Sequence, residues 1–62
     1  MNITVVIPAL NEGQAIGQVV QAVPGHRVRQ VIVVDNGSSD DTVRRARAAG
    51  ARVVQEIGRA HV

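Results

Sequence analysis

The apolar residues of this chain change period along the sequence, and the change predicts strands and helices in alternation. Apolar runs occupy residues 3–7, where Thr4 is the one polar residue, and residues 31–34. Runs so rich in Val and Ile are typical of strands buried on both faces of a parallel sheet. We expect the first strand to end at Pro8, which has no N–H to give to a strand ladder. A shorter third strand is expected over residues 52–55.

A helical period follows the first strand. The apolar residues then recur at the spacing i, i+3, i+4, i+7, which predicts a helix with one buried stripe. The stripe consists of Ile16, Val19, Val20 and Val23. Asn11 is the expected N-cap, with Gln14 three residues later in the manner of a capping box. Pro24-Gly25 is the expected stop.

The second strand runs into an acidic turn that contains a glycine and then into a second helix. This helix is expected to begin near Ser38 or Ser39, which places Asp40 and Asp41 in its electropositive first turn. Gly50 is placed to cap its C-terminus.

The resulting order, β-α-β-α-β, predicts an α/β fold with parallel strands and right-handed crossovers. If the strands progress in one direction across the sheet, both helices lie on one face and the other face is bare. If the direction reverses, each face receives one helix. Neither arrangement covers both faces of such apolar strands. We therefore expect residues 1–62 to form the first, incomplete part of a larger domain, with a break at residues 58–62.

Composition allows little margin for stability. A 62-residue chain buries only about 60% of the surface that its unfolded form exposes. It has no cysteine and no aromatic residue, so its core depends on aliphatic packing. The absence of cysteine is compatible with a reducing compartment. The apolar run at residues 3–7 is too short for a signal peptide or a membrane span. We expect a soluble, cytoplasmic segment.

The charge pattern argues against a nucleic-acid partner. The net charge is +2, and all seven basic residues are arginine. Arg44, Arg45 and Arg47 cluster in the second half of the predicted helix, where cations suit the helix dipole and face water. A nucleic-acid site favours a broader basic stripe and stacking aromatics. We expect a solvated helix face that binds no nucleic acid.

The two turns that follow the first two strands hold the candidate chemistry. Asp35 ends a buried strand, and open α/β sheets bind ligands at that edge. Neither turn carries a dinucleotide fingerprint, a P-loop or a hydrolase nucleophile motif. Two structural alternatives stay open. Asp35 could form an Asx turn with the amides of Gly37 or Ser38, and Glu12 could be a favourable first-turn acid.

Two segments of the chain, which include these turns, resemble a known family. Residues 6–12 read Val-Ile-Pro-Ala-Leu-Asn-Glu, and residues 33–42 read Val-Val-Asp-Asn-Gly-Ser-Ser-Asp-Asp-Thr. In sequence and spacing they closely resemble the N-terminal part of family 2 glycosyltransferases, the inverting GT-A enzymes that include polyprenyl-phosphate sugar transferases. The resemblance extends from residue 3 to about residue 59. It implies a partial, Rossmann-like GT-A fold.

The resemblance also implies a nucleotide-diphospho-sugar donor, whose base and ribose lie against the ends of the first two strands. Asp35 would accept hydrogen bonds from the base or ribose, a role suited to an ionised carboxylate. Asp40 and Thr42 match positions that mainly hold the second turn and cap its helix. The residues that match the donor-lining turn after the first strand are Pro8, Ala9, Asn11 and Glu12.

Three features depart from the family pattern. Many members carry an aromatic residue at the position of Leu10, and a second aspartate is common at the position of Asn36. Because of these two departures, the resemblance does not indicate which nucleotide is bound. The family's Asp-x-Asp motif, which binds the divalent cation (Mg²⁺ or Mn²⁺), and its catalytic base lie beyond this chain, so we expect cation ligands outside it and no catalytic residue within it.

The predicted function is therefore donor binding in an enzyme that transfers a sugar to an acceptor such as polyprenyl phosphate or a saccharide. This segment is expected to make no membrane contact, while the full enzyme is open to membrane association. Two alternatives remain. A nucleotidyltransferase would be expected to carry a glycine-rich basic loop, which residues 8–13 lack. A receiver-like interaction module would need a lysine, and the chain has none.

Overall fold

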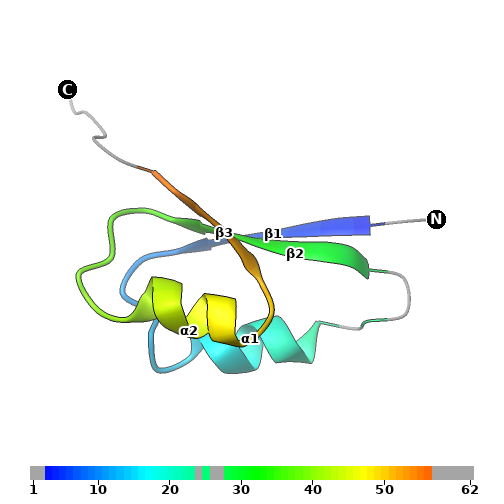
Figure 1. Ribbon diagram of the computed structural model, residues 1–62, viewed down its shortest axis with the longest axis horizontal. Helices are drawn as coiled ribbons and strands as arrows, with labels where there is room; N and C mark the ends of the chain where they lie inside the picture. The colour runs from blue at the N-terminus through cyan, green and yellow to red at the C-terminus, as the bar shows by residue number, and fades with distance from the viewer. Residues whose placement is uncertain (1–2, 24, 26–27, 57–62) are drawn as a thin grey trace.

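The computed structural model describes residues 3–23, 25 and 28–56. Its elements follow the predicted order, which confirms the β-α-β-α-β fold (Figure 1). The elements are β1 (Ile3–Ala9), α1 (Ile16–Ala22), β2 (Val28–Asp35), α2 (Thr42–Ala48) and β3 (Arg52–Gln55). The predicted break at residues 58–62, and Pro24 of the predicted helix stop, lie outside the described residues. Neither helix of the described part is long and apolar enough to cross a membrane.

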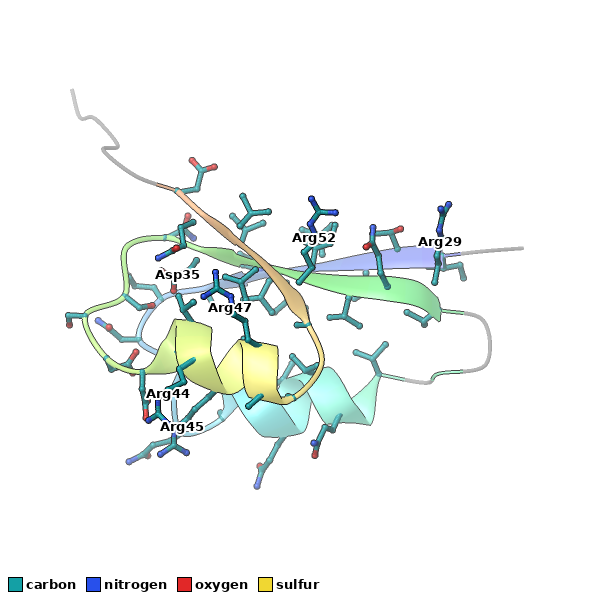
Figure 2. All side chains as sticks on the ribbon, viewed as in Figure 1. Arg29, Asp35, Arg44, Arg45, Arg47 and Arg52 are labelled. Carbon is teal, nitrogen blue, oxygen red and sulfur yellow. The ribbon has the colours of Figure 1, made fainter. Side chains whose placement is uncertain are left out.

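The three strands form a parallel sheet in the order β1-β2-β3. The strands thus progress in one direction, and both helices lie on the same face of the sheet (Figure 1). Of the two arrangements that the sequence allowed, this is the one with a bare face. On that face Val6 is 58% exposed and Val54 is 42% exposed. Arg52 points away from the helices (Figure 2).

The core lies between the sheet and the two helices. Its buried apolar residues are Ala9, Ile16, Val20, Val33, Ala46 and Ala51. Ile16 and Val20 confirm the predicted buried stripe of α1, but Val19 is 44% exposed. Val19 instead lines a small hollow beside β1 with Ile7 and Pro8. Within the described residues, the sheet and α2 therefore bury only part of the apolar stripe of α1.

The prediction that Pro8 ends the first strand is wrong. Strand β1 continues to Ala9, with Pro8 paired to Val34 and Ala9 paired to Asp35. Because β1 is an edge strand of the described sheet, the missing N–H of Pro8 can face away from β2 and cost no ladder bond. Strand β2 is also longer than residues 31–34, because pairing with β1 extends it to Val28.

The predicted start of the first helix is also wrong. Helix α1 begins at Ile16, and its N-cap residue, Ala15, makes no side-chain cap bond. Asn11 lies well before the helix in the left-handed region, at φ 51°. Its side chain accepts a hydrogen bond from the backbone N–H of Ser39, at 2.8 Å. A partner distant in sequence has displaced the local capping box.

The second helix likewise begins later than predicted. Helix α2 starts at Thr42 rather than near Ser38 or Ser39, and no acid lies in its first turn. Asp41 occupies the N-cap position without a side-chain cap bond. Asp40 caps from one residue further out, because its Oδ1 accepts the backbone N–H of Thr42 at 3.0 Å.

The C-terminus of α2 is built as predicted. Gly50 has φ 103°, a conformation that strains residues with a Cβ. Its N–H donates to Arg47 O at 3.0 Å, and the N–H of Ala51 donates to Ala46 O at 3.1 Å. These two bonds form a Schellman motif, which turns the chain directly into β3.

Candidate functional site

Two turns meet at the carboxyl edge of the sheet. The first turn (residues 10–15) follows β1, and the second turn (residues 36–41) follows β2. Parallel strands bring their carboxyl ends to one edge, so the pairing of Ala9 with Asp35 sets the turns side by side. The N–H of Asn36 donates to Ala9 O at 2.9 Å and extends this pairing into the second turn.

Side chains fasten the turns to each other. Three successive backbone N–H groups of the first turn donate to side-chain oxygens that lie 27 to 30 residues further along the chain. The pairs are Asn11 N to Ser38 Oγ (2.8 Å), Glu12 N to Thr42 Oγ1 (2.9 Å) and Gly13 N to Asp40 Oδ2 (3.1 Å). Thus Asp40 and Thr42, expected to hold the second turn, also hold the first.

Asp35, the last residue of β2, leads into the second turn and is only 2% exposed. Its Oδ2 accepts the backbone N–H groups of Gly37 at 3.3 Å and Ser38 at 3.1 Å. Its Oδ1 accepts the hydroxyl of Ser38. The Asx-turn alternative is therefore confirmed. A direct bond from Asp35 to a ligand stays a prediction.

The neighbouring acids are held ionised by their donors. The hydroxyl of Thr42, which donates to Asp40, lowers the pKa of that carboxyl below its ordinary value, and the backbone N–H groups of Thr42 and Gly13 act in the same direction. The hydrogen bond from Arg45 lowers the pKa of Asp41, as do the positive charges of Arg45 and Arg44.

Two arginines of α2, Arg44 and Arg45, project from the outer part of the molecule. The side chains of Arg44 and Arg45 are 76% and 53% exposed, and each lies within 3 Å of Asp41 Oδ2. Figure 2 shows both beyond the helix. Arg47 is exposed as well, so all three arginines are solvated as the sequence predicted. Exposed pairs of this kind contribute little to stability.

Open hollows adjoin the first turn. One, of about 420 Å³, is lined by Asn11, Glu12, Gln14, Ala15 and Asp40. Another, of about 210 Å³, is lined by Ile7, Pro8, Glu12, Ala15, Ile16 and Val19. Glu12 thus borders a polar hollow and an apolar one. Its carboxylate makes no hydrogen bond within the part of the chain that the structure describes.

The other predicted contacts differ in what they can offer. Ala9 is only 3% exposed, and its carbonyl already accepts Asn36 N–H. Leu10 is 52% exposed and presents an apolar surface beside the strand end. Asn11 uses its Oδ1 for Ser39, which leaves its NH₂ group able to donate.

The described acids do not suit a divalent cation. Among residues 3–23, 25 and 28–56, no three His, Cys, Asp or Glu side chains are grouped to hold a metal. Asp40 and Asp41, the nearest approach to an acidic motif, are already engaged by Thr42 and Gly13 and by Arg44 and Arg45.

Comparison with known proteins identifies the family. The sequence model described as "Glycosyl transferase family 2" matches residues 4–60. The chain belongs to this family. The match confirms the resemblance based on the two turns, and it disfavours the nucleotidyltransferase and receiver-like alternatives. The parallel sheet with its two helices is the corresponding part of the GT-A fold.

Two relatives are similar over most of this chain. The glucosyl-3-phosphoglycerate synthase of Mycolicibacterium smegmatis is 49% identical over 55 residues, which cover 84% of this chain and 18% of that protein. An uncharacterized glycosyltransferase of Mycobacterium bovis is 47% identical over 55 residues, which cover 87% of this chain and 24% of that protein. The chain thus spans about a fifth of the length of these relatives.

A solved structure shows the same arrangement. It is that of the Mycobacterium tuberculosis glucosyl-3-phosphoglycerate synthase in complex with Mn²⁺, UDP-glucose and glycerol 3-phosphate. It superimposes with a TM-score of 0.77 and 47% sequence identity, over 87% of this chain and 21% of that one. Another structure of that enzyme contains Mg²⁺ and UDP.

The sequence interpretation found the two turns but missed the bonds between them. Ser38 was expected only at the start of the second helix or as an amide donor to Asp35, and Gly13 was assigned no role. In the structure Ser38 accepts the N–H of Asn11, and Gly13 donates to Asp40. A signal for these bonds was present in the sequence. Serine, threonine and aspartate acceptors gather in one turn, and parallel pairing brings that turn beside the amides of the other.

Proposed function

We propose that this chain binds the nucleotide of a nucleotide-diphospho-sugar donor in an inverting glycosyltransferase. In this proposal residues 1–62 are the N-terminal part of one GT-A domain. The observation that carries it is the joining of the two family-matched turns at the carboxyl edge of the sheet, beside open hollows. UDP-glucose is the first donor to test, because the similar synthase has been solved with it.

Within this site, Glu12 is the principal proposed acceptor for the base or ribose. It is exposed and borders both hollows, and its carboxylate can accept donors from a nucleoside. Asn11 supplies its NH₂ group, while Pro8 and Ala9 form the wall beside the strand end. The direct contact predicted for Asp35 requires access to a carboxylate that is 2% exposed, so we give it the lesser share of ligand contact.

The cation and the acceptor are proposed to be held by residues outside this chain. When bound, Mg²⁺ or Mn²⁺ would neutralise the charge that develops on a diphosphate leaving group. The names of the relatives favour 3-phosphoglycerate as the acceptor, ahead of polyprenyl phosphate or a saccharide. A cytoplasmic location is likewise a proposal, carried over from the sequence interpretation.

Nucleotide binding by the full-length protein tests the proposal. Isothermal titration with UDP and UDP-glucose in Mg²⁺ is expected to show binding. Glu12→Gln should lower the affinity for UDP about tenfold, since a hydrogen bond to a charged group is worth about 1.5–3 kcal/mol. Asp35→Ala should also weaken it, because the second turn loses its anchor.

Asp41→Asn is the matched control, because it neutralises a carboxylate that faces the exposed arginines. Its UDP affinity should stay within about twofold of wild type. Wild-type protein that binds no nucleotide would overturn the function, whereas unchanged binding by Glu12→Gln would overturn only the role of Glu12. Release of UDP from UDP-glucose, assayed with 3-phosphoglycerate, polyprenyl phosphate and a saccharide in parallel, would identify the acceptor.

A further inference from the structure

The part of the first turn next to β1 depends on the second turn for its shape. Its own backbone bonds converge on Glu12 O, which accepts the N–H groups of Ala15 at 2.9 Å and Ile16 at 2.7 Å. Upstream of these bonds, Asn11 stands at φ 51°, which is uncommon for a residue with a Cβ. The amides of residues 11–13 all donate across to the second turn or to the start of α2.

Two of the acceptors are hydroxyl groups, and each is oriented by a carboxylate. The hydroxyl of Ser38 donates to Asp35 and accepts the N–H of Asn11. The hydroxyl of Thr42 donates to Asp40 in the same way. A hydroxyl has one proton. When that proton is used in a hydrogen bond to the carboxylate, the lone pairs of the hydroxyl oxygen remain free to accept the backbone amide. Bonds to an ionised acceptor are stronger than neutral ones, so each carboxylate fixes the direction of its hydroxyl.

Burial makes this arrangement hard for water to replace. Thr42 is 0% exposed and Asp35 is 2% exposed. If the hydroxyl of Thr42 were removed, the N–H of Glu12 and an oxygen of Asp40 would both lose a partner. Asp40 Oδ1 would keep the N–H of Thr42, but the N–H of Glu12 lies in a part-buried bond, so part of its desolvation cost would remain.

We propose that Asp35 with Ser38, and Asp40 with Thr42, are positioning pairs that set the backbone of the first turn for donor binding. This rests on the proposed function. The pairs act through the amides of Asn11 and Glu12, whose residues border the hollow where the nucleotide is proposed to bind. In this role Ser38, Asp40 and Thr42 govern donor affinity without themselves touching the donor.

The test removes one hydroxyl from the full-length protein. Thr42→Val keeps the shape of the side chain but removes the hydroxyl that joins Asp40 to the Glu12 amide. Thr42→Ser restores that hydroxyl. Thr4→Val makes the same change at an exposed residue of β1 outside the two turns and serves as the control. Amide exchange followed by NMR reports on the hydrogen bonds that join the two turns, which we call the clasp. Titration with UDP reports on the donor site.

In Thr42→Val we expect the Glu12 amide to exchange at least about tenfold faster and the Kd for UDP to rise about tenfold, which corresponds to about 1.4 kcal/mol. Thr42→Ser should return both quantities to within about threefold of wild type, and Thr4→Val should change neither. If Thr42→Val does not fold, Ser38→Ala with the Asn11 amide as the reporter tests the other pair.

Two results would overturn the proposal. Unchanged exchange at Glu12 would show that Thr42 does not hold the turn. Faster exchange with unchanged UDP affinity would show that the clasp does not position the site. Lack of UDP binding by wild type would instead overturn the proposed function, and it would be seen before any variant is made.

Discussion

At the scale of single residues, Gly13 is selected by space rather than by backbone conformation. It is buried beneath the carboxylates of the second turn. A Cβ at this position would overlap Asp41 Oδ1 and lie 3.0 Å from Asp40 Oδ2. The oxygen of Asp40 cannot retreat freely, because it accepts the N–H of Gly13 itself. By contrast, a Cβ at Gly17 in α1 would meet nothing within 4 Å.

We therefore predict opposite effects for one substitution at these two glycines. Gly13→Ala should lower the free energy of unfolding by about 1–3 kcal/mol, the usual cost of overpacking. Gly17→Ala should raise it by up to about 1 kcal/mol, because alanine favours helix. Urea denaturation of the full-length variants measures both changes. Equal midpoints for the two variants would contradict the close approach of the acids to Gly13.

The same residues show how far sequence reasoning reaches. The sequence located Asp35 at a strand end and offered its Asx turn as an alternative, because both inferences need only local information. It assigned Asn11 to the N-cap of the first helix, which was wrong. The true partners of Asn11, Ser38 and Ser39, lie 27 and 28 residues away. Local propensity gives no weight to an acceptor that only sheet pairing brings near.

At the scale of elements, helix ends divide into those decided locally and those decided by tertiary contacts. The C-terminus of α2 was predicted correctly because a Schellman motif is made within one short segment around Gly50. The N-termini of α1 and α2 were predicted too early. The polar residues expected to cap them, Asn11, Ser38 and Ser39, instead bond between the two turns.

The C-terminal motif gives a prediction at this scale. Gly50→Ala should lower the free energy of unfolding by about 1–2 kcal/mol, because a Cβ is strained at positive φ. Gly50→Asn should cost less, since asparagine tolerates the left-handed region better. Thermal denaturation of the two full-length variants gives the comparison. A loss for asparagine equal to or greater than that for alanine would argue against a conformational cause.

At the scale of the whole molecule, the sheet is covered on one side only within the described residues. Both helices lie on one face (Figure 1), and the opposite face presents Val6 and Val54 in an exposed state. Strand β1 is also a sheet edge. An exposed apolar face beside an open edge favours association with other chains.

We therefore predict that residues 1–62, expressed alone, are partly unfolded or aggregate. Light scattering and circular dichroism should show association or a broad, non-cooperative thermal transition. In the double variant Val6→Thr and Val54→Thr, association should decrease, because the exposed face becomes more polar. A sharp, cooperative transition of the wild-type monomer would contradict this prediction.

The sequence by itself determined the order of the elements, the parallel sheet and the family, because each follows from short-range periodicity or from two contiguous motifs. It also indicated that two helices could not cover both faces of the sheet. Only the tertiary structure decided that the strands progress in one direction, so that both helices share a face. It also decided that Asp40 and Thr42 hold the first turn. These features depend on contacts between segments distant along the chain, whose geometry becomes defined only when the strands pair.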